Sequence, residues 1–485
     1  MAVKDLGPLQ MCLGGEWVGA SNGATQTVVN PATEEVIATV PSASAADVDG
    51  AVAAARRALD GAWGRMSARD RGRLVWKIGQ QLMTRADEVA RLETLHNGKP
   101  IFESRQIDIP SAAECFEYYA GWADKIQGET IPVKGPYFAY TLREPVGVCG
   151  LIVPWNFPLV IAAWKLGPAL ACGNTVVLKP SPETPLTALA LAKLAAEAGL
   201  PEGVLNVVPG PGPGCGDALV AHPLVRKISF TGSTATGTGI MKAAADGIKR
   251  VSLELGGKSP NIVFDDADLE LCVEKTVWSV FYNAGQDCCA RSRILVHRKI
   301  HDRFVEQLVA RTKKFVVGHP EKKGTQIGPI ISRRQYDKVA GYIAAGKAEG
   351  AKLLCGGTRP KGVPPKGHYL SPAVFAGADD NMQIVREEIF GPVLAVIPFK
   401  DEAEAIRLAN DSAYGLSASL WTRDVGRVLR VTRAVQSGVI SVNTSSSVHL
   451  EAPFGGYKGS GLGRELGLKA LDLYSEVKNV FISNV

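Results

Sequence analysis

The sequence predicts an α/β protein with two doubly wound domains, because short apolar runs rich in β-branched residues alternate with amphipathic helical stretches. Strand–helix units of this length join parallel strands through right-handed crossovers. The chain has 485 residues, enough for two or three domains of ordinary size, and its hydrophobic fraction of 46% supplies their cores.

The first alternating region begins with an apolar run at residues 146–153, which predicts a buried strand, and continues with a helix at 158–171. The other elements predicted in this region are a strand at 175–178, a helix at 185–198, and strands at 204–208 and 227–230.

A second alternating region starts near Asn261. Its predicted elements are a strand at 294–296, helices at 300–317 and 334–349, and strands at 393–397, 417–421 and 439–442. Glycines and a proline at 256–260 interrupt two apolar runs. We therefore expect the boundary between the two domains at this point.

Two segments fit neither domain core. Residues 126–141 predict a protruding hairpin, and residues 474–483 predict a terminal strand with mixed apolar faces. Exposed strands of this kind can pair with another subunit.

The charge pattern argues against nucleic-acid and membrane partners. The formal net charge is +6, and no run of about five or six like charges occurs. The longest apolar runs are shorter than the roughly 18 residues that cross a bilayer. Residues 1–8 carry two charges and no apolar core, so no secretory leader is expected there. These features predict a cytoplasmic protein.

The nine cysteines form no CxxC pair, which favours reduced thiols that are mostly buried. Of the seven histidines, His297 and His301 lie four residues apart, between a predicted strand end and a helix start. No third ligand stands at a recognisable spacing, so the sequence predicts no metal site.

Three short motifs carry candidate chemistry. In residues 281–290 (FYNAGQDCCA), a thiol, of Cys288 or of Cys289, lies at the end of a helical run beside Gly285, which permits an abrupt turn. A thiolate there could attack an electrophilic carbon, whereas the alternative is a pair of buried structural cysteines.

The other two motifs contain Glu254 and Asn156. Glu254 lies at a predicted strand end before paired glycines, where burial would raise its pKa and suit it to general-base work; the alternative is a surface glutamate. Asn156 lies at a strand-to-helix turn, where its amide could donate to an oxyanion or cap the helix.

Asn156, Glu254 and Cys288 stand in that order within PWNFP, LELGGKSPN and FYNAGQDCCA, and this combination resembles the aldehyde dehydrogenase superfamily. The resemblance covers nearly the whole chain, from NPAT at 30–33 to PFGGYK at 453–458. Further matching segments are residues 179–181, 230–234, 387–392 and 463–467.

The resemblance implies a Rossmann-variant cofactor domain, a catalytic domain and a small β element for oligomerisation. The matching ranges are 1–125 and 142–256 for NAD(P) binding, 257–458 for catalysis, and 126–141 with 470–485 for oligomerisation. A homodimer or a homotetramer is expected.

The resemblance also implies a hydrolytic dehydrogenase in which Cys288 attacks a small-molecule aldehyde to give a thiohemiacetal and then a thioester. Glu254 would activate the water that releases the carboxylate. Asn156, with the backbone N–H of Cys288, would form the oxyanion hole. Lys165 and Glu465 match residues proposed to relay the proton to solvent.

The implied cofactor is NAD. By resemblance, Lys179 would bind the adenosine ribose, Ser233 the pyrophosphate and Glu388 the nicotinamide ribose, with Phe390 beside the ring. Residues 232–237 match the family's variant of the Rossmann turn in place of a GxGxxG fingerprint. The other residues expected around the cofactor are Pro154, Trp155, Ser181, Gly232, Glu254, Leu255 and Gly256.

Two positions depart from the family pattern. Pro182 stands where strongly NAD-specific relatives often have a glutamate that repels a 2′-phosphate, with Glu183 one place later, so NADP is not excluded. Asp287 stands where many relatives have a small, apolar or thiol residue. It either lines the substrate tunnel, favouring a polar or cationic aldehyde, or points elsewhere.

The resemblance places Phe157, Trp164 and Phe454 in an aromatic pocket around the aldehyde, with residues 444–451 at its variable mouth. His449 is expected to be a loop residue. Cys289 either forms a reversible disulfide with its neighbour or is a packed thiol. The physiological aldehyde stays open among aliphatic, aromatic, betaine and amino aldehydes.

Three other protein classes are alternatives for this sequence: a CoA-acylating semialdehyde dehydrogenase, a cysteine hydrolase or esterase, and a binding protein built on an inactive enzyme. Glu254 argues against the first class, because acylating relatives usually lack this base. A cysteine hydrolase needs a histidine beside the thiol, and no histidine here stands in a recognisable partner motif. The three intact catalytic positions argue against the last class.

Overall fold

A computed structural model describes residues 9–446 and 448–483, and its first sheet has eight strands in the order β2-β1-β9-β8-β7-β10-β11-β21. Neighbours from β9 to β11 are parallel, and β2, β1 and β21 join antiparallel. The strands are β1 (Met11–Leu13), β2 (Glu16–Val18), β7 (Val148–Ile152), β8 (Thr175–Lys179), β9 (Leu205–Val207), β10 (Val225–Thr231), β11 (Arg250–Glu254) and β21 (Gly461–Leu462).

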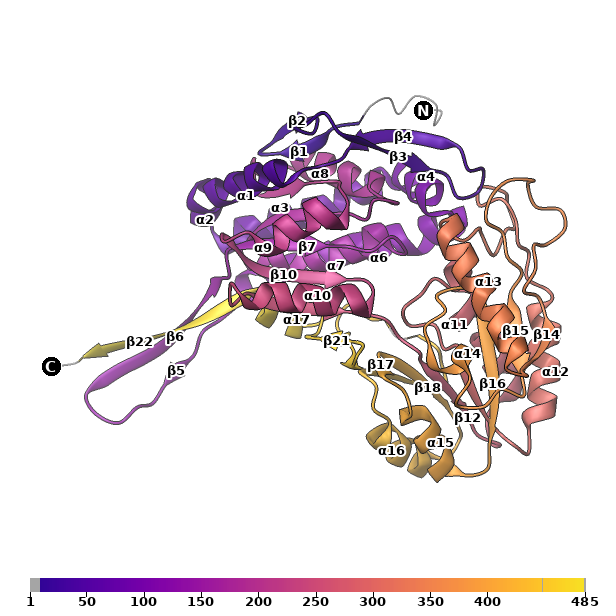
Figure 1. Cartoon of the computed structure of the whole chain (residues 1–485). Helices are drawn as coiled ribbons and strands as arrows, with labels where there is room; N and C mark the ends of the chain where they lie inside the picture. The colour runs from indigo at the N-terminus through magenta and orange to yellow at the C-terminus, as the bar shows by residue number, and fades with distance from the viewer. Residues whose placement is uncertain (1–8, 447, 484–485) are drawn as a thin grey trace.

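Helices cover both faces of this sheet because successive strand residues point to opposite sides (Figure 1). Leu151 packs with the helices of one face, and its neighbour Ile152 packs with those of the other. The first face holds α3 (Ala68–Thr84), α4 (Ala86–Asn97), α6 (Ile109–Ala120), α7 (Pro158–Ala171) and α8 (Leu186–Glu197). The second holds α1 (Ala45–Asp60), α9 (Asp217–Ala221) and α10 (Thr234–Ala245).

The strand order reverses direction at β7. From β7 the chain moves outward through β8 to β9, and it then returns to the other side of β7 to form β10 and β11. In open α/β sheets, ligands bind outside the carboxyl ends of the strands at such a switch point. The sheet therefore places a binding crevice beyond Ile152 and Thr231, the last residues of β7 and β10.

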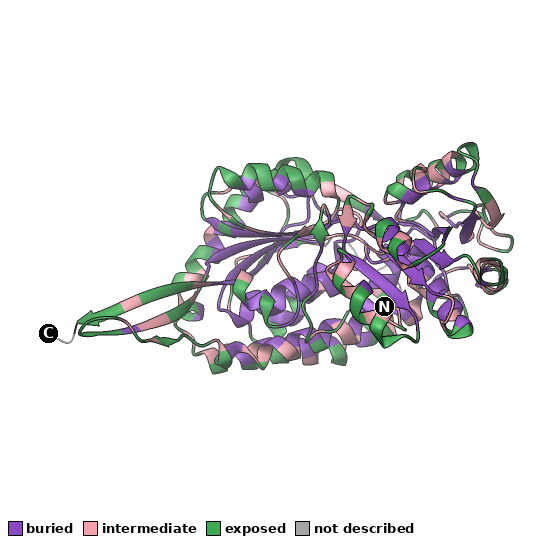
Figure 2. Cartoon of the chain, turned by 90° about the horizontal axis from the view of Figure 1, so that it is seen from below, coloured by how far each residue is buried: buried purple, intermediate pink, exposed green. Residues whose placement is uncertain are grey.

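The second sheet has seven strands in the order β14-β15-β16-β13-β12-β18-β19, all parallel except β14. They are β12 (Pro260–Val263), β13 (Arg293–His297), β14 (Lys352–Cys355), β15 (Ala373–Ala376), β16 (Val393–Phe399), β18 (Ser417–Trp421) and β19 (Val439–Val442). Its helices are α11 (Leu269–Phe281), α12 (His301–Thr312), α13 (Arg333–Ala348), α14 (Gln383–Arg386), α15 (Glu402–Asn410) and α16 (Val425–Ala434). Figure 2 shows the buried sheets enclosed by helices with exposed outer faces.

The predicted doubly wound α/β architecture is confirmed in both sheets, and the helix predicted at 158–171 coincides with α7. The helix predicted at 300–317 is too long, since α12 ends at Thr312. The amides of Lys314 and Phe315 donate to carbonyls three residues back, and Val317 bridges to Ile327. The apolar residues after Thr312 therefore belong to a turn and a bridge, although they continue the helical pattern.

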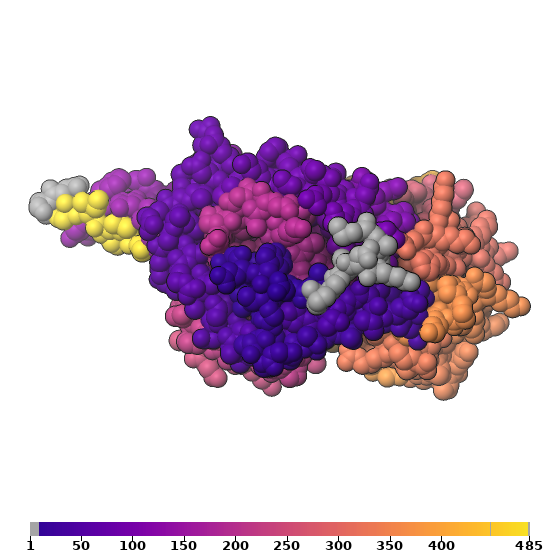
Figure 3. All heavy atoms as spheres, turned by 90° about the horizontal axis from the view of Figure 1, so that it is seen from above, coloured from indigo at the N-terminus to yellow at the C-terminus, as the bar shows by residue number. Residues whose placement is uncertain are grey.

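A third sheet projects from the body as a long arm, with the C-terminal strand running beside the hairpin (Figures 1 and 3). Its order is β22-β6-β5, formed by β5 (Thr130–Ile131), β6 (Tyr137–Pro145) and β22 (Ser475–Ser483). The predicted protrusion is confirmed, but the predicted end at residue 141 is wrong, because β6 pairs with β22 as far as Pro145.

The remaining elements are small. A two-stranded sheet joins β3 (Thr25–Val29) to β4 (Val36–Pro41), and another joins β17 (Tyr414–Gly415) to β20 (Tyr457–Lys458). Three short helices complete the fold: α2 (Ala62–Arg65), α5 (Ile101–Glu103) and α17 (Lys469–Leu473). Among the described residues, no helix is both long and apolar enough to cross a bilayer.

Candidate active site

Two cavities meet at Cys288, which lines both of them together with Ile161. One, of about 330 Å³, lies at the switch point of the first sheet, against the residues that follow β7, β10 and β11. The other, of about 450 Å³, opens toward α6 and residues 448–454. A thiol at this junction can be reached by different molecules from two sides.

A left-handed turn carries Cys288 to this junction. The chain leaves α11 at Phe281, and Asn283, Ala284 and Gly285 then take φ angles of 47°, 55° and 72°. A Cβ on Gly285 would lie 2.2 Å from the carbonyl oxygen of Gly391, so this position requires glycine. The glycine recognised in the sequence is thus the point where the turn packs against the second sheet's loops.

Amide side chains fix the turn to the first sheet. Asn156 Nδ2 donates to the carbonyl of Gln286 at 3.1 Å, and Asn283 Nδ2 donates to the carbonyl of Asn156 at 2.8 Å. The helix-cap alternative for Asn156 is wrong, because α7 has Phe157 as its N-cap and no side-chain cap bond. Asn156 is buried beside the nucleophile turn, as an oxyanion donor would have to be.

Cys288 and Cys289 are both free thiols, with their sulfurs 3.9 Å apart. Cys289 is buried, which favours the packed-thiol alternative. The pKa of Cys288 lies well above its usual range. The hydrogen bond with Cys289 is the larger cause, and burial is the second. Cys288 therefore needs help to lose its proton. Donor atoms of Asp287 and both cysteines lie within 4.8 Å of one another, and we assign no metal there.

Glu254 ends β11 as a buried carboxyl, so the surface alternative is wrong. Neither of its carboxyl oxygens has a hydrogen-bond partner among the described residues. Burial, assisted by the nearby Glu465, raises the pKa of Glu254 well above that of an ordinary glutamate. A carboxyl with free oxygens and a raised pKa suits general-base work.

Lys165 and Glu465 form a buried ion pair close to Glu254. Lys165 Nζ also donates to Ser229 Oγ at 3.0 Å, and Ser229 Oγ donates to Glu465 Oε1 at 3.2 Å. The structure thus brings together two residues 300 positions apart in the sequence.

The switch-point cavity has the features that a dinucleotide needs. Ser233 caps the N-terminus of α10, accepting from Thr236 N at 3.3 Å, and helix N-termini bind phosphates. Glu388 Oε1 accepts from Gly257 N at 2.9 Å, and the rings of Trp155 and Phe390 meet edge to face at 5.1 Å. The expected residues that line this cavity are Pro154, Trp155, Gly232, Ser233, Leu255, Gly256, Glu388 and Phe390.

Lys179 and Ser181 lie at the carboxyl end of β8, the neighbour of β7, outside the lining of that cavity. Lys179 Nζ donates to the carbonyl of Pro180 at 3.0 Å, and burial lowers the pKa of Lys179. Ser181 Oγ donates to Glu183 Oε2 at 2.5 Å.

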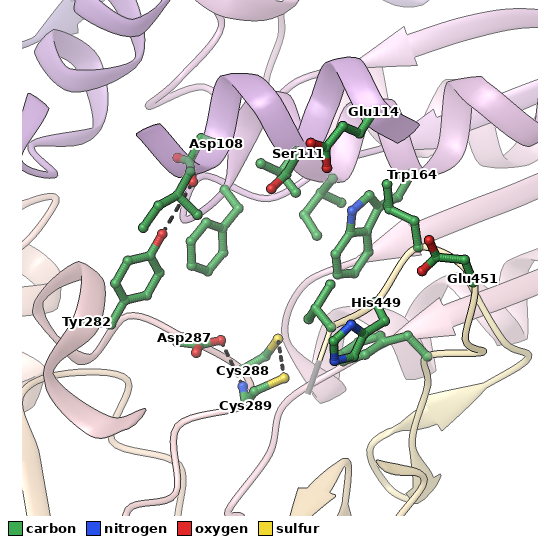
Figure 4. Close-up of a pocket in the computed structure, with 17 residues that line it drawn as sticks. Asp108, Ser111, Glu114, Trp164, Tyr282, Asp287, Cys288, Cys289, His449 and Glu451 are labelled. Atoms are coloured by element: carbon green, nitrogen blue, oxygen red, sulfur yellow. Dashed lines mark hydrogen bonds between the residues drawn. The ribbon is translucent and has the colours of Figure 1, made fainter. Parts of the chain in front are cut away.

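The larger cavity has aromatic walls (Figure 4). Phe157 stacks on Tyr282 with ring centroids 5.8 Å apart, and Trp164 meets Phe454 edge to face at 5.2 Å. The three aromatic residues expected around the substrate therefore line one cavity.

Asp287 lines the same cavity, so the alternative that it points elsewhere is wrong. Its Oδ1 accepts from Cys289 N at 2.9 Å, and burial raises the pKa of its carboxyl. His449 lies on an exposed loop of the wall, with Nε2 3.4 Å from Ser446 Oγ, as expected for a loop residue. Of the predicted mouth, residue 447 lies outside the described residues.

Several lining residues were not anticipated. The larger cavity also contains Asp108, Ser111 and Glu114, whose three-residue spacing puts them on one helical face and could have indicated them. The smaller cavity contains Arg334 and Lys338 at the start of α13, a basic i,i+4 pair that could have indicated an anion.

Comparisons with known proteins agree with this geometry. Residues 17–480 match the model of the aldehyde dehydrogenase family. Human mitochondrial aldehyde dehydrogenase is 49% identical over 477 residues, covering 98% of this chain and 92% of that protein.

Two solved structures also superpose closely on the chain. The NAD+ complex of a Bacillus cereus aldehyde dehydrogenase has a TM-score of 0.97 at 46% identity, covering 99% of this chain and 97% of that one. Betaine aldehyde dehydrogenase from Staphylococcus aureus, also in complex with NAD+, has a TM-score of 0.96 at 41% identity, with 98% and 95% covered. The chain therefore belongs to the aldehyde dehydrogenase family and is an oxidoreductase that acts on aldehydes.

Proposed function

We propose that this protein oxidises an aldehyde to a carboxylate with NAD+ and water, through a covalent thioester on Cys288. The observation that carries the proposal is the position of Cys288 on the wall shared by two cavities, one lined by aromatic rings and the other at the switch point of the first sheet. One molecule can deliver the carbonyl carbon to the sulfur while another approaches from the opposite side.

The first step is attack by Cys288. The thiol gives its proton to water, its sulfur bonds to the aldehyde carbon, and the carbonyl oxygen becomes an oxyanion. The amide of Asn156 has two N–H groups, of which one donates to the carbonyl of Gln286. The remaining N–H and the backbone N–H of Cys288 would stabilise the oxyanion.

The residues of the switch-point cavity fit a nicotinamide dinucleotide, and two solved relatives contain NAD+. When bound, the cofactor supplies the acceptor for the hydride that leaves the aldehyde carbon. Ser233 would hold the pyrophosphate and Glu388 the nicotinamide ribose, and Phe390 would lie beside the nicotinamide ring. Lys179 and Ser181 would bind the adenosine ribose.

Glu254 completes the reaction by taking a proton from the water that attacks the thioester. The C–S bond breaks, the carboxylate leaves, and the thiol of Cys288 is restored. The Lys165–Glu465 pair would pass the proton from Glu254 toward solvent, since Glu465 lies close enough to raise the pKa of Glu254.

The two sheets correspond to the proposed roles. We assign NAD binding to residues 1–125 and 146–256, catalysis to 257–458, and subunit association to 126–145 with 470–485. Cytoplasmic location stays a prediction, supported by nine unpaired cysteines, which are typical of a reducing compartment. Fractionation of the cells that produce the protein would test it.

Replacing Cys288 tests the proposed nucleophile. Cys288→Ala should lower kcat for NADH formation by on the order of 10⁴-fold or more, because it removes the sulfur that would form the thioester. Absorbance at 340 nm with a panel of aldehydes and no CoA measures it. The matched control is Cys355→Ala, a half-buried thiol far from both cavities. Equal loss in both variants, or activity retained in Cys288→Ala, would contradict the mechanism.

Replacing Glu254 tests the proposed base. Glu254→Gln should slow thioester hydrolysis by about 10²- to 10⁴-fold, so rapid mixing should show a burst of NADH and mass spectrometry an acylated Cys288. In the native protein, activity should fall as the pH drops through the raised pKa of Glu254, because only the carboxylate accepts a proton. This acidic limb should be missing in the variant. The exposed Glu306→Gln is the control, and an unchanged pH profile in Glu254→Gln would exclude this role.

Glu183 is proposed to repel the 2′-phosphate of NADP+. It would take the role of the glutamate that strongly NAD-specific relatives often have at the position of Pro182. Its carboxylate accepts from Ser181 and favours the charged form of Lys179. Glu183→Gln should raise kcat/KM for NADP+ relative to NAD+ by about tenfold, which corresponds to the loss of about 1.4 kcal/mol of like-charge repulsion. Steady-state rates with both cofactors measure the ratio, with Glu306→Gln as control. An unchanged ratio would remove Glu183 from cofactor selection.

The projecting arm is proposed to join subunits into a dimer or tetramer. Val477 and Phe481 are 59% and 57% exposed on β22, which leaves apolar surface without cover in one chain. Phe481→Asp should therefore give a smaller species in size-exclusion chromatography with light scattering. Leu429→Asp, at a 54% exposed position of α16, is the control. The same mass in the native protein and Phe481→Asp would show that this residue is not in an interface.

A further inference from the structure

Arg291 is a buried cation that is bonded to the backbone of the turn that carries Cys288 and Cys289. Its side chain is nearly inaccessible, and Nη1 donates to the carbonyl of Cys289 at 3.1 Å. Nε donates to Ser419 Oγ at 3.1 Å and Nη2 to Ser441 Oγ at 3.5 Å. These acceptors are neutral, and within the described part of the chain Arg291 forms no ion pair with a carboxylate. A buried guanidinium without a salt bridge is unusual, because burying a charge is costly unless it is paired.

The acidic groups that act on Arg291 belong to the turn that carries Cys288, here called the nucleophile turn (residues 282–289). Burial lowers the pKa of Arg291, whereas Cys289, Asp287 and Cys288 counteract that effect. A guanidinium remains protonated at neutral pH. Arg291 is therefore a fixed positive charge whose possible counter-charges are the two thiolates and the Asp287 carboxylate.

Cys289, Asp287 and Glu388 disfavour the Cys288 thiolate, whereas the cations Arg334 and Lys338 line the switch-point cavity that Cys288 also lines. Cys289 and Asp287 on the same turn, and Glu388 from the loop after α14, all raise the pKa of Cys288. From the α4 side, Lys99 acts on Asp287, although Lys99 is itself paired with Asp108. Arg291 is the cation whose guanidinium bonds directly to the backbone of the turn.

We propose that Arg291 is a positioning residue that fixes the nucleophile turn through the Cys289 carbonyl and supplies the positive charge that stabilises the Cys288 thiolate. Its contacts to Ser419 of β18 and Ser441 of β19 anchor that charge to the second sheet. Ser441 Oγ in turn donates to the carbonyl of Ser446, at the start of the cavity's mouth loop. The inference rests on the proposed function only in taking Cys288 as the nucleophile.

The test measures the alkylation rate of Cys288 by iodoacetamide as a function of pH, with the modified peptide quantified by mass spectrometry. Only the thiolate reacts, so the midpoint of the profile reports the pKa of Cys288. Arg291→Met should move the midpoint to higher pH and slow alkylation below it by about tenfold or more, since an opposite charge nearby shifts a pKa by about 1–3 units. Arg291→Lys, which keeps the charge, should restore most of the native rate.

A matched variant separates charge from structure. The double variant Ser419→Ala/Ser441→Ala removes two hydrogen bonds to the guanidinium but keeps its charge, so it should move the midpoint much less than Arg291→Met does. Arg291→Gln keeps a donor toward the Cys289 carbonyl without the charge, so it replaces Arg291→Met if that variant does not fold. Folding of each variant is checked by circular dichroism.

Two results would overturn the inference: a native midpoint in folded Arg291→Met or Arg291→Gln, or an equal shift in the serine double variant. Either result differs from failure of the proposed function. Alkylation counts thiolate whether or not the protein oxidises aldehydes, and the proposed function fails instead if the fully alkylated protein still forms NADH.

Discussion

The site depends on one constraint: the nucleophile turn packs directly against the backbone of two loops, and only glycine leaves room for these contacts. A Cβ on Gly257 would lie 2.3 Å from the carbonyl oxygen of Cys288, and a Cβ on Gly285 would lie 2.2 Å from that of Gly391. These glycines let the loops after β11 and α14 close around the turn. Because Gly257 lies between the two sheets in sequence, this contact brings Cys288 to the switch point of the first sheet.

Burial then sets the chemistry of the groups gathered there. Burial raises the pKa of Glu254, and the contact with Cys289, with burial as the next cause, raises the pKa of Cys288, so both groups are neutral more readily than in water. Nearby fixed charges are needed to stabilise the charged forms of these two groups when a proton is transferred. The Lys165–Glu465 ion pair lies close to Glu254, and Arg291 donates a hydrogen bond to the backbone carbonyl of Cys289. Glu254 thus lies near a buried ion pair, and the turn that carries Cys288 is bonded to a buried cation three residues after this cysteine.

Most of the architecture followed from the sequence, because the period of apolar residues determines whether a segment forms a strand or a helix. α7 and the central strands of both sheets lie where the pattern predicts them. The end of α12 did not follow, since Val317 continues the apolar pattern but pairs with Ile327. Arg291 was equally hidden: it stands one residue beyond the FYNAGQDCCA motif, and its role as a buried cation depends on serines in β18 and β19.

By itself the sequence determined the two α/β units, the three motifs and the family they resemble. Periodicity and motifs depend only on residues that are close together in the sequence. Only the tertiary structure decided between the alternatives at Asn156, Glu254 and Asp287. Asn156 contacts Gln286 across 130 positions of sequence, and Glu254 is buried by segments from outside its own strand. The physical reason is that burial and hydrogen-bond partners come from segments far apart in the sequence. Folding brings these segments together, and no local pattern in the sequence records the contact.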